Sequence, residues 1–380
     1  NDYLATCAQA GIMMYSIEMY KQIYESTQDL NALKEGYKVV QVMAKYGETL
    51  MDSYLSEDNK LILFKLGAAI LFDRSIYFAH ELYKHTQDQQ YLEDAFFYAE
   101  RSKSTLLIHA LRSKGEQSLV MLPETEKAKE KALQQALLQL KKQKIESENA
   151  EESNALLKKI NAINREIEDF KLNLMDQYPS YYKHRYDIGL GDLNAVQTYL
   201  AQEDAVLIEY ALGVQMHYVF VISKDSLQLI PLNIDPTKDK LHTVNMRKVL
   251  TKYAYLIEQE EKADSLLIEC SHYFYQTYLS AAVKNVNKGK HLIIIPDQHL
   301  AHLPFETFMS RRPSRDAAYK NYPFLLKDYP ISYNYSATIM LNQQNNHKSN
   351  PVDKKGILAF AASYPNVSSS SATANRGSSR

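Results

Sequence analysis

Apolar side chains recur at helical spacing through the first part of the chain, from Tyr3 to about Gly115. This stretch contains no proline, and its apolar and small residues recur three or four positions apart, which places them on one face of a helix. The clearest series is Leu66, Ala69, Phe72, Ile76 and Ala79. The pattern predicts successive amphipathic helices.

Two stretches of this region, residues 24–37 and 83–96, repeat one another at an offset of 59 residues. The matching positions are Tyr24 and Tyr83, Thr27 and Thr86, Gln28 and Gln87, Asp29 and Asp88, and Leu33 and Leu92, with Phe96 in the place of Tyr37. In each copy the Thr-Gln-Asp sequence lies between two apolar-periodic runs, where polar side chains bind free backbone groups at helix ends. The repeated unit is therefore predicted to be a long helical hairpin.

Hairpins of this kind cannot bury their apolar faces alone, so they stack into a solenoid with a concave face. We therefore interpret residues 1–118 as a helical repeat arm that binds protein or peptide ligands. A helical bundle with a chance repeat is the alternative that the sequence leaves open.

A heptad pattern follows Pro123, where the composition shifts to Ala, Leu, Lys, Glu and Gln. Its apolar residues are separated by alternating steps of four and three, which is typical of a seam between two helices. The series comprises Leu156, Ile160, Ile163, Ile167, Phe170 and Leu174, which Leu133, Leu137 and Leu140 of a preceding helix can face. Residues 119–185 are predicted to form a long antiparallel helical hairpin with its turn at 146–153. It is either a structural spacer or a partner-binding coiled coil.

The pattern changes to alternating strands and helices in residues 186–380, which predicts an α/β domain. The expected strands are residues 205–210, 217–222 and 227–231, which suit a meander, followed by a helical region at 243–287 and strands at 291–295 and 356–362. The run at 291–295 is continuously apolar, as a strand buried on both faces of a parallel sheet would be. Functional groups are expected at the carboxyl ends of such strands.

Four segments of the chain occur in an order that resembles a known family. They are residues 91–107 (YLEDAFFYAERSKSTLL), 296–308 (PDQHLAHLPFETF), 324–340 (FLLKDYPISYNYSATIM) and 356–365 (GILAFAASYP). The last three resemble the first half of a CHAT domain, the caspase-like peptidase module found attached to tetratricopeptide repeats (TPR). The first resembles the last repeat helix before such domains. The resemblance implies a TPR-like arm, a helical hairpin and the N-terminal part of an α/β caspase-like (CHAT) domain.

The resemblance also implies a cysteine endopeptidase in which a His and a Cys lie at the ends of two neighbouring strands. An adjacent imidazole is needed because a thiol is only slightly ionised near neutral pH. In the family both residues follow the strand that matches 356–362, so we expect a fragment without its catalytic dyad. Asn1 in the place of an initiator Met and the Ser-rich end at 368–380 point to the same expectation. A scaffold or adaptor with a catalytically inactive CHAT-like domain is the alternative.

Neither cysteine of the chain is predicted to be a nucleophile. Cys270 shares a helical face with Leu267, Phe274 and Tyr278, which is typical of a small buried side chain. His272 lies two positions further on, so it points to a different helix face and is not placed to act as a base. Cys7 lies on the first repeat helix.

Several polar residues after the strand at 291–295 are candidates for shaping a cleft, namely Asp297, His299 and Glu306. Structural roles are favoured for them, since Asp297 can cap the turn and Pro304 is expected to begin a helix with Glu306 in its first turn. His299 and His302 have no evident third ligand, so no metal site is expected. Arg311, Arg312 and Arg315 are predicted to form a solvated loop.

Composition excludes several classes of partner. The formal net charge of −1, with no long block of one sign, argues against nucleic acid. Two distant cysteines do not form a disulfide framework or a structural zinc site, which suits a reducing, cytoplasmic location. The chain has no membrane-spanning run, and Gly189 and Gly191 lack the third glycine of a nucleotide loop, so neither membrane contact nor a cofactor is expected. The expected partners are a protein or peptide ligand and a polypeptide substrate.

We predict that the 380-residue chain shows no thiol-dependent peptide cleavage. Alkylation of Cys270 is expected to change only the stability of the protein, because a buried thiol has no access to substrate. A fluorogenic peptide assay on the unmodified, alkylated and Cys270→Ala proteins checks this. Turnover that disappears in Cys270→Ala would contradict the interpretation of this residue.

Overall fold

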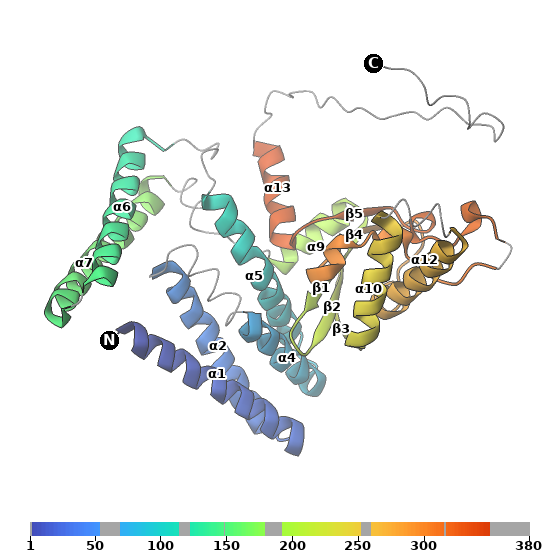
Figure 1. Ribbon diagram of the computed structural model, residues 1–380, viewed down its shortest axis with the longest axis horizontal. Helices are drawn as coiled ribbons and strands as arrows, with labels where there is room; N and C mark the ends of the chain where they lie inside the picture. The colour runs from blue at the N-terminus through green and yellow to red at the C-terminus, as the bar shows by residue number, and fades with distance from the viewer. Residues whose placement is uncertain are drawn as a thin grey trace. The chain divides into compact units, whose positions relative to one another are not determined.

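The computed structural model describes residues 2–53, 69–113, 122–147, 149–178, 192–251, 260–314 and 317–349. The predicted strand at 356–362, the Gly189 and Gly191 pair, and Arg315 lie outside these residues. Helices make up the described chain as far as residue 202, and a mixed five-stranded sheet with further helices follows (Figure 1). This order agrees with the predicted helical region followed by an α/β region.

The repeat predicted from the sequence is present as two helical hairpins. Helices α1 (Asp2–Thr27) and α2 (Leu30–Ser53) form the first hairpin, and α4 (Ala69–Thr86) and α5 (Gln90–Ser113) form the second. The two corners have the same backbone, with Gln28 at φ 59° and Gln87 at φ 58°. Since this left-handed conformation is unusual for a residue with a side chain, its recurrence shows that the two corners are structurally equivalent.

The corners also share their side-chain hydrogen bonds. In the first, Thr27 Oγ1 donates to the carbonyl oxygen of Ile23 at 2.6 Å and accepts from the N–H of Asp29 at 3.2 Å. In the second, Thr86 Oγ1 donates to the Leu82 carbonyl at 2.8 Å and accepts from the Asp88 N–H at 3.2 Å. These bonds satisfy backbone groups that a helix leaves free at its ends. The prediction of a repeated helical hairpin is confirmed.

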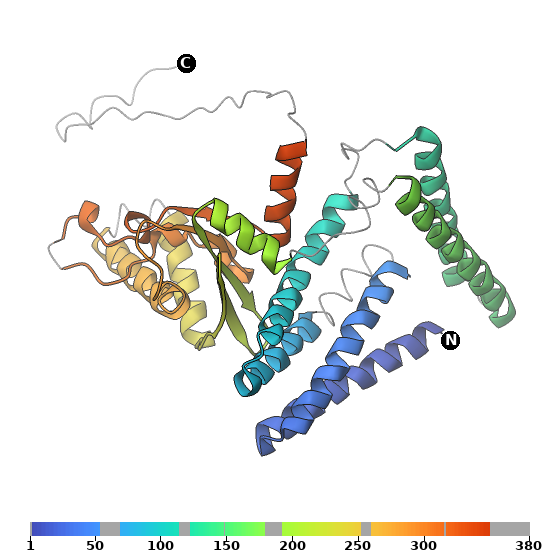
Figure 2. The ribbon, with the colours of Figure 1, turned by 180° about the vertical axis from the view of Figure 1, so that it is seen from behind.

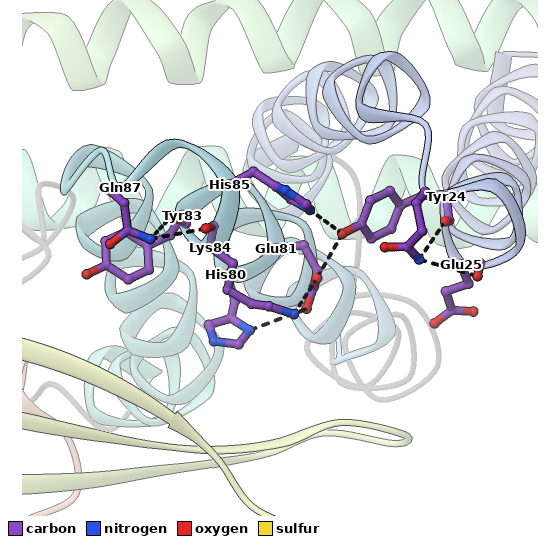
Figure 3. Close-up of polar contacts among 9 residues, drawn as sticks. Tyr24, Glu25, His80, Glu81, Tyr83, Lys84, His85 and Gln87 are labelled. Carbon is purple, nitrogen blue, oxygen red and sulfur yellow. Dashed lines mark hydrogen bonds and ion pairs between the residues drawn. The ribbon is translucent and has the colours of Figure 1, made fainter.

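The two hairpins contact each other through α2 and α4. The ring of Phe78 lies so close to Gly36 that a Cβ atom there would be 2.3 Å from the ring, which requires glycine at this position. A polar cluster extends the contact, because the hydroxyl of Tyr24 lies 3.0 Å from Glu81 Oε2 and 2.7 Å from His85 Nε2 (Figure 3). Hydrogen bonds to Glu81 outweigh the effect of burial and lower the pKa of its carboxyl to about 2.

A third hairpin consists of α6 (Glu124–Glu146) and α7 (Ala150–Gln177). Four residues of the predicted seam are buried, namely Leu156, Ile160, Phe170 and Leu174, so the antiparallel pair is confirmed. The turn is shorter than predicted. The side chain of Asn149 accepts a hydrogen bond from the N–H of Glu151 at 2.9 Å, so the polar residues after it form the first turn of α7.

The sheet has the strand order β3-β2-β1-β4-β5. Strands β1 (Ala205–Leu212), β2 (His217–Ser223) and β3 (Ser226–Pro231) form the predicted antiparallel meander. Strand β4 (His291–Ile295) runs parallel to β1, with Leu207 opposite Ile293, and β5 (Ile331–Tyr333) runs parallel to β4. The prediction that residues 291–295 form a buried strand of a parallel arrangement is confirmed.

The two faces of the sheet are covered by helices from different parts of the chain. The face that carries Leu207, Phe220 and Ile293 belongs to one hydrophobic cluster with α1, α2, α4 and α5, and with α9 (Leu193–Gln202). The opposite face, which carries Ile208 and Ile294, packs on α10 (Pro236–Thr251) and α12 (Glu260–Phe274). Figures 1 and 2 show α4 and α5 beside the sheet in both views. The helical repeat and the sheet therefore share one core.

Helix boundaries in the α/β region differ from those expected. Helix α10 begins at Pro236, seven residues before the predicted start, because the side chain of Asp235 accepts from the N–H groups of Thr237 and Lys238 at 3.0 and 3.1 Å. Helix α12 ends at Phe274 and continues as a π-helical turn, Tyr275–Leu279. The helix expected at Pro304 is only a three-residue 3₁₀ turn, Phe305–Thr307, with Pro304 as its cap.

A matched pair of glycine substitutions tests the contact between the hairpins. We expect Gly36→Ala to lower the free energy of unfolding by about 1–3 kcal/mol, because the new methyl overlaps the Phe78 ring. Gly11→Ala is the control, since nothing lies within 4 Å of its Cβ position. It is expected to raise the free energy of unfolding by about 0.5–1 kcal/mol through helix propensity. Urea unfolding followed by circular dichroism measures both, and a neutral Gly36→Ala would show that the hairpins do not meet here.

Candidate functional site

A cavity of about 400 Å³ lies where strands β1 and β4 end. Ligand sites of α/β sheets lie outside the carboxyl ends of parallel strands, so this position matches the general rule. Its wall is formed by the second repeat hairpin and by residues at and after the carboxyl ends of β1 and β4. The lining residues are Phe72, Asp73, Ile76, Ala99, Ser102 and Lys103 from the hairpin, and Ala211, Leu212, Gly213, Val214, Tyr218, Pro296, Asp297, Gln298 and Tyr335 from the α/β region.

Asp297 joins the ends of the two strands at this cavity. Its Oδ2 accepts a hydrogen bond from the N–H of Leu212 at 2.8 Å, and its Oδ1 accepts from the N–H of Gln298 at 2.8 Å. Each oxygen keeps a lone pair toward other donors, since a carboxylate accepts about four hydrogen bonds. Asp297 thus caps the turn, as the sequence favoured, and also lies in the cavity wall.

Asp73 is the second carboxylate in the wall, and sequence patterns did not indicate it. It lies on α4 with a side chain that is only 2% exposed, and Arg74 Nη1 donates to its Oδ2 at 2.9 Å. Burial raises the pKa of Asp73, although Arg74 and the backbone N–H groups of Gln215 and Met216 act in the opposite direction. The loop between β1 and β2 approaches Asp73 so closely that a Cβ on Gly213 would lie 1.6 Å from Asp73 Oδ1.

A buried ion pair links the repeat to β1 next to the cavity. Lys103 Nζ of α5 lies 2.7 Å from Oε1 of Glu209, whose side chain is fully buried in the strand. Burial, and then the neighbouring carboxyl of Glu100, raise the pKa of Glu209 well above its ordinary value, whereas Lys103 lowers it. Removal of a partner from such a pair leaves a charged group without solvent or counter-ion.

Glu100 itself is held by the start of α13 (Ala337–Ser349). Its two oxygens accept from the N–H of Ala337 at 2.8 Å and from the N–H and hydroxyl of Thr338, both at 2.6 Å. Free N–H groups and the helix dipole at a helix N-terminus favour a negative charge. The last repeat helix is therefore fastened to β1 through Lys103 and to α13 through Glu100.

His299 belongs to a different polar group, on the face of the sheet that α10 covers. Its Nε2 lies 3.0 Å from Asp239 Oδ2 of α10, and the hydroxyl of Tyr278 donates to Asp239 Oδ1 at 2.7 Å. Burial alone would raise the pKa of Asp239, but its hydrogen bonds with His299 and Tyr278 lower it. Tyr278 lies in the π-helical turn, a feature that is frequent at functional sites. This Asp–His pair fixes the orientation of an imidazole that is 29% exposed.

Glu306 has a purely local partner. Its Oε2 accepts from the hydroxyl of Tyr333 on β5 at 2.6 Å, and the same hydroxyl accepts from the N–H of Phe305 at 2.9 Å. Of the three candidates for shaping the cleft, only Asp297 lines the cavity, whereas His299 and Glu306 bind elsewhere. In the part of the chain that the structure describes, no group of three ligand side chains could hold a metal ion, and this includes His302.

Cys270 has a histidine neighbour that sequence reasoning missed. His242 Nδ1 of α10 lies 3.6 Å from Cys270 Sγ, and its ring stacks on Tyr273 at 4.1 Å. His272, which lies on a different face of α12, contacts the carbonyl oxygen of Met309 at 3.1 Å. The Cys270 side chain is completely buried, and burial raises the pKa of its thiol to about 12. The thiol therefore stays protonated at neutral pH, which agrees with the interpretation of Cys270 as a core residue.

Comparisons with known proteins add no relative. No protein-family model matches the sequence, and no curated protein matches it. Among the described helices, none is both long and apolar enough to cross a membrane. The assignment of a function therefore depends on the geometry of the cavity and on the motif order.

Substitution of Lys103 tests the ion pair beside the cavity. We expect Lys103→Met to lower the free energy of unfolding at neutral pH by about 2–4 kcal/mol, because the carboxyl of Glu209 loses its counter-ion. Because the pKa of Glu209 is raised, its carboxyl becomes protonated as the pH falls, and a neutral carboxyl needs no counter-ion. The loss of unfolding free energy in Lys103→Met is therefore expected to become smaller as the pH falls from about 8 to about 5.

Lys38→Met is the control for this prediction, since its pair with Glu35 is exposed on both sides. Its cost is expected to be under about 1 kcal/mol and to vary little over this pH range. Chemical denaturation at both pH values measures the two variants. Equal losses for Lys103→Met and Lys38→Met would show that the buried pair does not fasten α5 to β1.

Proposed function

We propose that this chain is the regulatory repeat and first strands of a CHAT-type cysteine endopeptidase, with the Cys–His dyad supplied by residues other than those described. In this proposal the TPR-like hairpins bind a protein, and the polypeptide substrate enters the cavity at the carboxyl ends of β1 and β4. The resemblance of residues 296–308 and 324–340 to CHAT segments supports the proposal, as does the location of the cavity at the carboxyl ends of parallel strands.

One side chain carries the regulatory part of the proposal. Arg74 of α4 donates from Nε to Glu18 of the first hairpin at 2.8 Å and from Nη1 to Asp73 at 2.9 Å. Its Nη2 donates to Gln215, in the loop after β1, at 3.0 Å. A shift of the first hairpin is thereby transmitted to a cavity-lining carboxylate and to the neighbouring loop. Through these contacts, a protein that binds the repeats can alter the cavity at the carboxyl ends of β1 and β4.

The charges of the cavity indicate the class of substrate. Asp297 and Asp73 contribute two carboxylates, of which Asp73 is paired with Arg74, and among the described lining residues the one cation, Lys103, is paired with Glu209. Complementary charge favours a partner of opposite sign. We therefore propose that the cavity receives an arginine or lysine side chain of the polypeptide, with Phe72 and Val214 available to contact its aliphatic stem.

The test is peptide cleavage by the complete gene product that contains this chain. We expect turnover of peptides with Arg or Lys at the cleaved position, loss of turnover on thiol alkylation, and no effect of Cys270→Ala. Asp297→Asn is expected to lower kcat/KM for basic peptides by about 10–100-fold and to leave a peptide with a neutral residue less affected, because a carboxylate contact is removed. Absence of thiol-dependent cleavage of any peptide would defeat the proposal.

An adaptor without peptidase activity is the second candidate. Cys270, the one cysteine whose side chain the structure describes, is buried and its thiol has a raised pKa, which fits this candidate as well as it fits a peptidase whose dyad lies elsewhere. Under this function the Arg74 network stabilises a rigid platform, and the helical surface binds a protein partner. Binding without cleavage in the same assays distinguishes it from the peptidase.

A further inference from the structure

The outer face of α1 is apolar and exposed. The side chains of Ile12, Tyr15, Met19 and Ile23 follow one another at helical spacing and are 66%, 75%, 40% and 37% exposed. A stripe of this kind is unfavourable in water and marks a surface that binds another apolar surface.

The repeat itself shows what such a face contacts. One repeat later, 59 residues on, the equivalent positions of α4 are Leu71, Arg74, Phe78 and Leu82, and they are only 4%, 5%, 0% and 1% exposed. In α4 this face meets the preceding hairpin, with Phe78 against Gly36 of α2 and Arg74 on Glu18 of α1. The face of α1 thus has the same position in its hairpin, and among the described helices none covers it as α2 covers its counterpart.

Terminal units of a helical solenoid require a polar outer face for solubility. Helix α1 does not have one, because four large apolar side chains occupy the positions that α4 buries. Over residues 12–23 the first hairpin therefore presents the kind of face that an internal unit of a stack buries.

We infer that the face of α1 formed by Ile12, Tyr15, Met19 and Ile23 binds a further helical hairpin of the same repeat. The second helix of that hairpin presents glycine or alanine where α2 presents Gly36, which lets Met19 approach its backbone as Phe78 approaches Gly36. The inference concerns this surface alone and does not depend on peptidase activity.

A second copy of the whole chain does not suit this role. Gly36 of α2 is already covered by Phe78, and its equivalent on α5, Ala95, is completely buried. Both small-residue helix faces of the two hairpins are occupied within one molecule. The occupant is accordingly a hairpin whose second helix is still uncovered.

An engineered array tests the inference. A second copy of residues 10–68 is inserted between residues 68 and 69 in a Cys7→Ser background, which makes the natural first copy the outer one. Tyr15→Cys is introduced into either the inner or the outer copy, and its reaction with a thiol reagent is timed. We expect the inner cysteine to react at least about tenfold more slowly than the outer one, because stacking buries it.

The matched control is Gly36→Leu in the outer copy alone. Its side chain fills the space that Met19 of the inner copy is expected to enter, so the inner cysteine should regain the rate of the outer one. An array whose outer copy carries Ile12→Glu and Met19→Lys supplies a polar end in case the first array is insoluble, and it leaves position 15 of the outer copy available for the cysteine. Equal rates in both arrays overturn the inference.

Self-association of the unmodified chain is the competing outcome. Sedimentation that shows a dimer, lost on Tyr15→Glu and Met19→Lys, would mean that the face pairs two copies and would overturn the assignment to a repeat hairpin. The inference is supported if the unmodified chain is a monomer and the α1 face is protected from the thiol reagent only in the arrays.

Discussion

One face of the sheet is covered by the second repeat hairpin, and the remaining features depend on this contact. Phe96 of α5 packs edge-on against Phe220 of β2 at 5.7 Å, within a cluster that runs from the first hairpin to β4. Because burial of apolar surface is the main favourable term in folding, the sheet and the repeat stabilise each other. A helical arm that in sequence appears separate is thereby part of the core of the α/β region.

This shared core places charged side chains where water is excluded. Arg74 and Lys103 come from the hairpin, and their partners Gln215 and Glu209 come from the sheet region. Buried charges of this kind contribute little net stability but are costly to separate, so they define one relative position of the two parts. The cavity between the hairpin and the sheet region has one carboxylate from each part, Asp73 from α4 and Asp297 from the end of β4.

The repeat also shows how local chemistry and stacking combine. The Thr-Gln-Asp corner closes each hairpin with hydrogen bonds to its own backbone, and this corner is the same in both copies. The outward faces are not the same, since α4 buries its stripe on α2 and α1 leaves its stripe exposed. The conformation of a corner is therefore determined by residues of its own hairpin, whereas the burial of an outward face depends on the neighbouring hairpin.

The sequence by itself determined the elements whose signals are local. The helical hairpins, the coiled pair of α6 and α7, the meander and the buried strand β4 all follow from periodicity and turn residues, which act over a few positions. It also indicated that Cys270 is a core residue and that Asp297 caps the turn after β4.

Only the tertiary structure decided which elements share a core and which side chains meet. Asp73, Glu209 and the two neighbours Glu100 and Lys103 come from three elements that are distant in sequence, and nothing local distinguished them from surface charges. The same holds for His242 beside Cys270 and for Asp239 beside His299. Their positions depend on long-range hydrophobic contacts between helices and sheet, which periodicity does not specify.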